Sequence, residues 1–362
     1  MSLHPGEPLH MQVERQVRAA ILSGQWGPGM KLPPNDALAE SFGTSVFTVQ
    51  TALSRLCREG ILERTPRIGT FVRGRGPRLT CSGVYFGSNV WSDLESGFSK
   101  AVYRHVSEKF SATGVKTKIW TDSRPEAEQS KPLPELMQAI KRGEIQSLVV
   151  PLANGTDIRW LKQLPIATAI MFGDAEIEGR LVFQIREALH ASVQSLKQQG
   201  CRKVGLITSL KVRNELLPET ADTAPSFFSD FIDAVEDAGL ETRNSWIRAA
   251  TSYPRHLESY GYEEFNALWS QRERPDGLIV YADIVARGVI TGALARRVRI
   301  PRDLKLVLHA NDEMPYPCPF PATQMVTPVS QCADGLIHII RQKLEGNPTP
   351  AVSVPLSIQT IS

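Results

Sequence analysis

Short apolar runs alternate with helical patterns along most of the chain, and this alternation limits the fold more than any other feature. SGVYFG at 82–87 and KTKIW at 116–120 are early runs, and LKLVLHA at 304–310 closes the series. Segments with a helical period lie between such runs, as at 93–112 and 188–200. Strands that alternate with helices predict parallel, doubly wound sheets, so we expect an α/β fold. About 280 residues of this pattern favour two sheets over one.

The N-terminal residues follow a different pattern. Residues 8–23 predict an amphipathic helix, and ALAESFGTSVFTVQTALSRL at 37–56 predicts two short helices broken at Gly43. ILERTPRIGTFVRG at 61–74 predicts two strands joined by a turn. Three helices and such a hairpin indicate a winged helix-turn-helix, a module that binds DNA.

The helix that follows Gly43 has two distinct faces. Its apolar stripe consists of Val49, Ala52, Leu53 and Leu56, which predicts burial of that side. Small and mostly polar residues occupy the other side, namely Ser45, Phe47, Thr48, Gln50, Thr51, Ser54 and Arg55. A helix of this kind can lie in the major groove of DNA.

Positive charge is concentrated at the N-terminal end of the chain. Residues 1–80 contain ten Lys and Arg against six Asp and Glu, a net charge of +4, although the whole chain carries only +3. Five arginines between Arg64 and Arg78 have no acidic residue among them. This excess favours a polyanionic partner over an ordinary solvated surface.

The remaining bulk features exclude several classes of protein. Five cysteines lie far apart without a C-x-x-C pair, which argues against a metal knuckle or a disulfide framework and fits a reducing cytoplasm. No apolar run reaches the roughly 18 residues that span a bilayer. No G-x-S-x-G, HExxH or GxxxxGK[ST] motif occurs, so an enzyme is not expected.

Residues 8–72 resemble the GntR family of winged-helix repressors. The resemblance is carried in order by GQWGPGMKLP at 24–33, LAESFGTS at 38–45, TVQTALSRLCREGIL at 48–62 and GTFV at 69–72. Residues 81–362 resemble the effector domain of LacI-type repressors, which is similar to periplasmic binding proteins. Residues 274–312 and 192–207 carry that second resemblance.

Together the two resemblances imply a cytoplasmic transcription regulator, with a repressor as the first expectation. It would bind a DNA operator as a homodimer, need no cofactor, and bind a small sugar-like effector between two lobes. The implied domains are 1–72 for DNA binding, 73–80 as a linker and 81–362 for the effector. Within the last, we expect lobe 1 at about 81–184 and 313–347, and lobe 2 at about 185–312 and 348–362.

The DNA-binding residues depart from the family's pattern. The family usually has Arg near Asp36, at the position of Val46, and a basic residue where this chain has Gln50. Arg is the most frequent reader of guanine, so a different operator is expected. Val46 and Phe47 are candidates to contact thymine methyls, and Gln50 to pair with adenine, although Val46 packing against a neighbouring helix is equally open. Phosphate and wing contacts are assigned to Lys31, Ser45, Thr48, Arg55, Arg64, Arg67, Gly69 and Thr70.

Candidate effector contacts follow the ends of several predicted strands. The family comparison and the strand ends suggest Ser88, Asn89, Trp91, Asp93, Phe172, Gln184, Phe227, Asp283, Asn311 and Asp312. Asp93 is also a plausible N-cap. Gln184 stands where the family has Asp, and Phe227 where it commonly has Arg, which indicates a less charged pocket. His309 also follows a strand, but a buried core histidine is the commoner outcome.

Two other functions stay open at this point. One is a small-molecule-binding module whose DNA recognition has degenerated, since Asp36 and Val46 replace expected arginines. The other is an enzyme on a doubly wound scaffold, for which no catalytic motif is found. The first would bind ligand tightly without selecting an operator.

Overall fold

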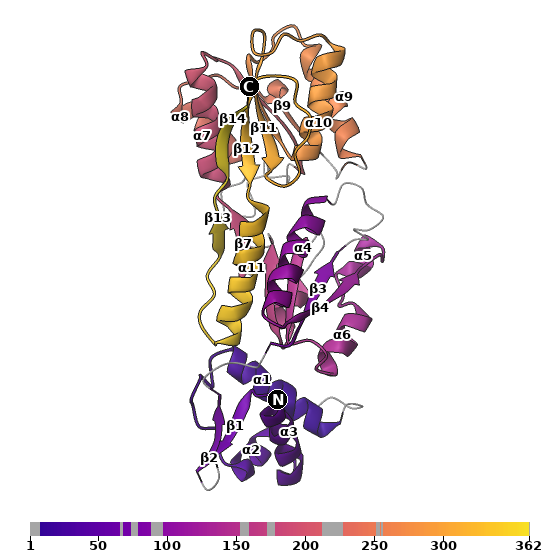
Figure 1. Ribbon diagram of the computed structural model, residues 1–362, viewed down its shortest axis with the longest axis vertical. Coiled ribbons are helices and arrows are strands. Elements are labelled where there is room, and N and C mark those ends of the chain that lie inside the picture. The colour runs from indigo at the N-terminus through magenta and orange to yellow at the C-terminus, as the bar shows by residue number, and fades with distance from the viewer. Residues whose placement is uncertain are drawn as a thin grey trace. The chain divides into compact units, whose positions relative to one another are not determined.

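The computed structural model describes residues 8–65, 68–73, 79–87, 97–152, 159–171, 178–211, 227–250, 254 and 256–361 (Figure 1). These fall into two compact units. The first contains the N-terminal module and one six-stranded sheet, and the second contains the other six-stranded sheet. The expected α/β class with two mainly parallel sheets is confirmed. Among the described residues, no helix has both the length and the apolar character needed to cross a bilayer.

The N-terminal module is a winged helix-turn-helix, as expected. It consists of α1 (Leu9–Leu22), α2 (Asn35–Phe42), α3 (Val46–Arg58), β1 (Leu62–Thr65) and β2 (Gly69–Val72). The two strands pair antiparallel, with Thr65 opposite Gly69. Each helix and the wing contribute side chains to one core, including Val17, Leu38, Leu53 and Val72. The module therefore has a hydrophobic core of its own.

The first lobe is built on a sheet with the strand order β13-β7-β6-β5-β3-β4. Its strands are β3 (Cys81–Phe86), β4 (Lys116–Thr121), β5 (Ser147–Leu152), β6 (Ala167–Met171), β7 (Arg180–Phe183) and β13 (Val352–Val354). Its helices are α4 (Gly97–Ala112), α5 (Glu126–Gln129), α6 (Pro134–Lys141) and α11 (Val329–Leu344), with the 3-10 helix η1 (Arg159–Gln163). Strands β3 to β7 run parallel.

The second lobe has the strand order β14-β12-β11-β10-β8-β9. Its strands are β8 (Val204–Lys211), β9 (Ile247–Ala250), β10 (Gly277–Tyr281), β11 (Lys305–Asn311), β12 (Ala322–Thr327) and β14 (Ser357–Ile361). Its helices are α7 (Ile185–Gln198), α8 (Phe227–Asp237), α9 (Leu257–Trp269) and α10 (Asp283–Ala295), with η2 (Asn244–Trp246). Only β14 pairs antiparallel among the described pairs of this sheet.

Both faces of this sheet are covered by helices, which explains its continuous apolar strands. Successive residues of β10 point to opposite faces. Leu278 and Val280 pack with α9 and α10, whereas Ile279 and Tyr281 pack with α7 and α8.

The chain first passes from the first lobe to the second close to the expected point, after β7, but its last two passages differ from the expected ones. The sequence analysis assigns 313–347 to lobe 1 and 348–362 to lobe 2. The structure places β12 in the sheet of the second lobe and β13 in the sheet of the first. The last two passages therefore follow β12 and β13, because β12 pairs in parallel with β11 and extends that sheet by one more strand.

Two glycines allow α9 and α10 to approach each other closely (Figure 1). A Cβ atom on Gly288 would lie 1.9 Å from the carbonyl oxygen of Glu258, and one on Gly261 would lie 2.2 Å from that of Val285. In both cases the obstacle is the backbone of the other helix. The packing of this helix pair therefore requires glycine at both positions.

A buried polar network closes the end of β4 in the first lobe. The hydroxyl of Tyr85 donates to Asp122 at 2.9 Å, and the guanidinium of Arg124 donates to both carboxylate oxygens at 2.8 and 2.6 Å. The side-chain amide of Gln129 donates to the backbone carbonyl oxygens of Asp122 and Arg124, and the backbone carbonyl of Gln129 accepts from the indole N–H of Trp160. Asp122 is fully buried, so these bonds replace its hydration.

Candidate functional site

The helix-turn-helix positions α3 through local signals in the sequence. Gly43 ends α2 in the left-handed conformation, with a φ of 61°. Ser45 then caps α3, because its hydroxyl accepts a hydrogen bond from the backbone N–H of Thr48 at 3.1 Å. The stripe of Val49, Ala52, Leu53 and Leu56 is fully buried, which fixes the rotation of the helix.

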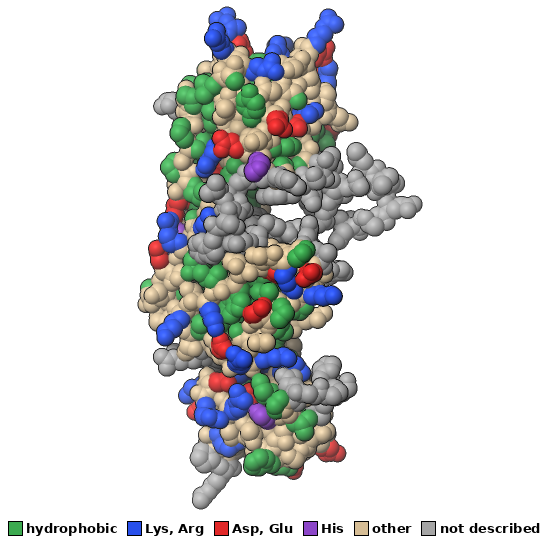
Figure 2. Space-filling model, turned by 90° about the vertical axis from the view of Figure 1, so that its right-hand side faces the viewer, with side chains coloured by type: hydrophobic (Ala, Val, Ile, Leu, Met, Phe, Trp, Pro, Cys, Tyr) green, Lys and Arg blue, Asp and Glu red, His purple; other side chains and the backbone are tan. Residues whose placement is uncertain are grey.

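The opposite face of α3 presents apolar and neutral side chains to solvent. Phe47 is 78% exposed and Val46 is 40% exposed, and Gln50 is exposed as well. Val46 is not part of the hydrophobic core of the module. Figure 2 shows hydrophobic side chains at the surface of the N-terminal module, beside Lys and Arg. Val46 and Phe47 are consecutive exposed apolar residues, and together they suit a contact surface.

Arg55, in contrast, is engaged inside the module. Its Nε lies 3.1 Å from Glu14 of α1, and its Nη1 donates to His10 at 3.3 Å. The Glu14 side chain is only 8% exposed. Burial raises the pKa of Glu14, and Arg55 and Arg18 oppose that rise. Because Arg55 neutralises a buried acid, it has a role inside the module rather than the expected phosphate contact.

The wing carries the other expected contacts. Arg64 is exposed, and Gly69 has a φ of 143°, which other residues rarely adopt. The exposed Lys31 runs beside Gly69, where a Cβ atom would meet its Cε at 2.7 Å. The carbonyl of Thr70 accepts from the N–H of Leu32. Arg67 lies outside the described residues.

In the second lobe, polar and aromatic side chains gather at the carboxyl ends of β10 and β11. The Tyr281 ring lies 5.1 Å from that of Phe227 and 4.5 Å from that of His309, between centroids. Asp283 follows Tyr281 at the start of α10, and its carboxylate lies 3.9 Å from the guanidinium of Arg287. Parallel sheets bind ligands at this edge.

Several buried polar atoms in this cluster have no hydrogen-bond partner among the described residues. They are Oδ2 of Asp283, Nε of Arg287, Nδ1 of His309, and both Oδ1 and Nδ2 of Asn311. Burial raises the pKa of Asp283, and the charge of the Arg287 guanidinium opposes that rise. An unsatisfied buried group costs roughly 1–3 kcal/mol, so such groups are rare in native proteins. Their concentration at one place makes this cluster the candidate site for a polar molecule.

The buried His309 makes the stability of this lobe depend on pH. Its Nε2 lies 2.8 Å from the hydroxyl oxygen of Thr327, and burial lowers its pKa from 6.5 to about 3. The unfolded chain therefore takes up a proton below pH 6.5 that the folded chain does not. Stability is complete above pH 6.5 and falls as the pH drops toward 3.

We expect urea unfolding at pH 5 to show about 2 kcal/mol less stability than at pH 7 from this group alone. His309→Gln should remove that part of the pH dependence. His256→Gln, at an exposed position, should keep it. Equal slopes in the wild type and His309→Gln would contradict the assignment.

The structure brings only some of the expected effector residues together. Phe227, Asp283 and Asn311 belong to the cluster. Asp312 does not, because its carboxylate accepts from the backbone N–H of Val329 and caps the start of α11. Gln184 directly precedes α7, with no side-chain cap bond. Five further residues, Ser88, Asn89, Trp91, Asp93 and Phe172, lie outside the described residues.

Sequence reasoning missed three members of the cluster. Tyr281 is the last residue of β10, and Arg287 lies one helical turn after Asp283. Both residues could therefore have been identified from the sequence as neighbours of the predicted site. Tyr316, whose hydroxyl donates to the carbonyl of His309 at 2.7 Å, lies between strands and carried none. The guanidinium of Arg287 lies 5.7 Å from the Tyr316 ring centroid.

Comparisons with known proteins divide the chain in the same way. Residues 9–72 match the family model for bacterial regulatory proteins of the gntR family, and residues 193–361 match that for a periplasmic binding protein-like domain. The HTH-type transcriptional repressor NagR of Bacillus subtilis is 43% identical over 65 residues, 18% of this chain and 27% of that protein. The repressor PurR of Pectobacterium atrosepticum is 26% identical over 116 residues, 32% of this chain and 30% of that protein. The chain thus matches under a third of either relative.

Solved structures share the fold of the two lobes. A LacI-family regulatory protein from Chloroflexus aggregans superposes with a TM-score of 0.59 at 16% identity, covering 77% of this chain and 96% of that one. A LacI-family regulator from Arthrobacter sp. FB24, solved in complex with lactose, gives 0.59 at 13% identity, covering 77% and 97%.

Proposed function

Because residues 9–72 match the gntR family of bacterial regulators and residues 193–361 a periplasmic binding protein-like domain, we propose that this chain is a DNA-binding transcription repressor controlled by a small polar ligand. The observation that carries the proposal is the free outer face of α3 on a complete helix-turn-helix core. Such a face is available to the major groove. The relatives NagR and PurR are both repressors, which supports repression rather than activation of transcription.

A salt titration of DNA binding tests the proposal. Each phosphate contact releases counterions, so the logarithm of the association constant should fall linearly with the logarithm of salt concentration. Fluorescence anisotropy with the full chain and fragments of its own promoter would measure this. Absence of binding at low salt, or binding without any slope, would remove the DNA-binding function.

The exposed face of α3 supports an operator code based on A·T pairs. Phe47 and Val46 offer apolar surface that fits the thymine C5-methyl group, and the amide of Gln50 matches adenine N6 and N7. Ser45 and Thr48, whose hydroxyls lie 2.8 Å apart, are placed for phosphate contacts with Lys31 and Arg64. No Lys or Arg lies in the first two turns of α3 to read guanine.

Replacing thymine with uracil in a selected operator measures the methyl contact directly. Burying one methyl group contributes about 0.8 kcal/mol, so uracil at the contacted position should weaken wild-type binding roughly fourfold. Phe47→Ala should bind the thymine operator more weakly and should not distinguish thymine from uracil. Thr51→Ala, on the same face, should still distinguish them. A uracil effect that persists in Phe47→Ala would exclude this contact while leaving DNA binding intact.

The cluster in the second lobe is the proposed ligand-contacting surface. Its carboxylate, amide and aromatic rings suit a hydroxylated, sugar-like molecule, and the lactose complex of the Arthrobacter regulator supports that class. A thermal-shift screen over sugars would identify the ligand, since a bound ligand stabilises the fold by mass action. Asn311→Leu should abolish the shift. A sugar that stabilises both proteins equally would place its site elsewhere.

A homodimer on a two-fold operator is the expected assembly.

Degenerate DNA recognition is the second candidate function, and two observations favour it. Asp36 is exposed in the first turn of α2, where it repels phosphate, and Arg55 is engaged by Glu14. Under this alternative the chain binds ligand but selects no operator from random DNA.

A further inference from the structure

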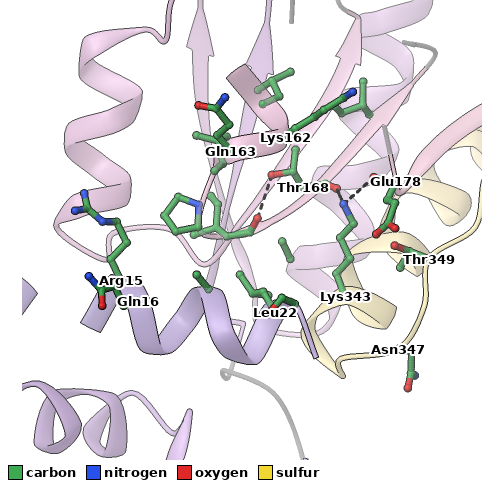
Figure 3. A pocket seen from close by; sticks show the side chains of 18 residues that line it. Arg15, Gln16, Leu22, Lys162, Gln163, Thr168, Glu178, Lys343, Asn347 and Thr349 are labelled. Atoms are coloured by element: carbon green, nitrogen blue, oxygen red, sulfur yellow. Dashed lines mark hydrogen bonds between the residues drawn. The ribbon is translucent and has the colours of Figure 1, made fainter. Parts of the chain in front are cut away.

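A second pocket lies in the first compact unit, at the amino end of β6 and away from the strand ends that bind ligands in such sheets. Its volume is about 680 Å³, within the usual size of small-molecule sites. Residues of α1, the segment 161–170 and the end of α11 line it (Figure 3). The proposed function makes no use of this pocket.

Lys343 provides a fixed positive charge in the pocket. Its ammonium group donates to the carbonyl oxygens of Thr168 at 2.7 Å and Glu178 at 2.9 Å (Figure 3). An ammonium has three N–H donors, so one has no acceptor among the described residues. Gly179, with a φ of 75°, leaves room for this side chain, because a Cβ atom there would meet Lys343 Nζ at 2.6 Å. The lysine is therefore held in place before any ligand arrives.

The rest of the lining separates charge from apolar surface. Arg15 and Lys162 add positive charge, and Glu178 is the only acid among the lining residues that the structure describes. Ala19 and Leu22 of α1, with Pro165 and Ile166, supply an apolar wall. Figure 3 shows Arg15 and Gln16 well apart from Lys343, on the other side of the pocket.

We propose that this pocket binds a small organic anion with an apolar body. The third N–H of Lys343 donates to the anionic group, and the apolar wall covers the body. Gln16, whose buried Oε1 has no partner among the described residues, accepts from a donor at the far end of the ligand. Because α1 belongs to the DNA-binding module, occupancy adds contacts between that module and the first lobe.

Calorimetric titration of the full chain with three probes tests this at constant ionic strength. Phenylacetate carries both the anion and the body, acetate only the anion, and 2-phenylethanol only the body. Phenylacetate should bind saturably at one site, and the other two at least about tenfold more weakly. Lys343→Met should weaken phenylacetate binding about tenfold or more, the usual effect of losing a hydrogen bond to a charged group, and leave 2-phenylethanol unchanged.

Lys197→Met is the control, because this exposed lysine also donates to a carbonyl, that of Ala238, but in the second lobe. It should bind phenylacetate as the wild type does. Where Lys343→Met does not fold, the wild-type pH profile decides. Burial lowers the pKa of Lys343, so phenylacetate binding should fall as the pH rises from 7 to 10.

Equal phenylacetate affinities in the wild type and Lys343→Met would overturn the proposal, as would pH-independent binding or no saturable binding at millimolar concentration. None of these measurements involves DNA. Their failure is therefore distinguishable from a failure of the proposed regulatory function.

Discussion

Asp122→Ala lowers the free energy of unfolding by about 3 kcal/mol, the lower end of what breaking a buried ion pair costs. The substitution removes the acceptor for Tyr85 and both carboxylate acceptors for Arg124, and leaves the guanidinium of Arg124 its bond to the carbonyl of Lys131. We expect a loss at the lower end of this range because the Arg124 side chain is 23% exposed, so water can hydrate its guanidinium once the carboxylate is removed. Urea unfolding at pH 7 measures the loss.

A surface ion pair in the same lobe serves as the control for Asp122. Lys109 lies 2.8 Å from Asp334, whose side chain is 59% exposed. Asp334→Ala should change stability by at most about 1 kcal/mol.

The stabilisation by Asp122 also depends on pH. Burial alone would raise the pKa of Asp122, but its hydrogen bonds from Arg124 and Tyr85 lower it. The stabilisation is therefore present above pH 3.8 and is lost as the pH falls through the lowered pKa, and Asp122→Ala should lack this acid dependence.

Gly288→Ala should destabilise the second lobe by about 3 kcal/mol, although alanine is the better helix former by about 1 kcal/mol. The added methyl group overlaps the backbone of Glu258 and Tyr262, so α9 and α10 must move apart. Asp283 and Arg287 lie on the displaced helix, and binding of the polar ligand should weaken as well. Thermal unfolding and ligand titration of the same variant measure both effects.

Thr291→Ala is the matched control on α10. Thr291 is exposed, and its hydroxyl bond to the carbonyl of Arg287 is made at the surface. We expect a change within about 0.5 kcal/mol. If Gly288→Ala were as stable as Thr291→Ala, the close approach of the two helices would not be a requirement of the fold.

The helices and strands with a clear periodicity were predictable, because the spacing of apolar residues within each element shows which of its faces is buried. The stripe from Val49 to Leu56 and the alternation along β10 are examples. The lobe boundary at 313 was wrong because β12 follows a segment with no helix before it, so the alternation gave no sign of one more parallel strand. The sequence gives no sign that Gly261 and Gly288 are required, since each makes room for the backbone of another helix that lies elsewhere in the chain.

Candidate site residues were predictable only where their place in a helix or strand, by itself, determines whether they are exposed. Phe47 and Gln50 are exposed because Val49 and Leu53 are buried on the same helix. Arg55 shares that helix, yet its role depends on Glu14, forty-one positions earlier, through a contact that periodicity does not report. Asp312 was misassigned for a related reason, because an acid after a strand serves equally as a cap for the next helix.

The late return of β13 to the first sheet has a consequence for synthesis on the ribosome. The N-terminal module has all its core residues by Val72, so it can fold early in translation. The first sheet acquires its edge strand only at Val352–Val354 and the helix α11 shortly before. A nascent chain thus carries a complete winged helix-turn-helix while both lobes still lack their final strands, so this module is folded before the lobe that holds the polar cluster is complete.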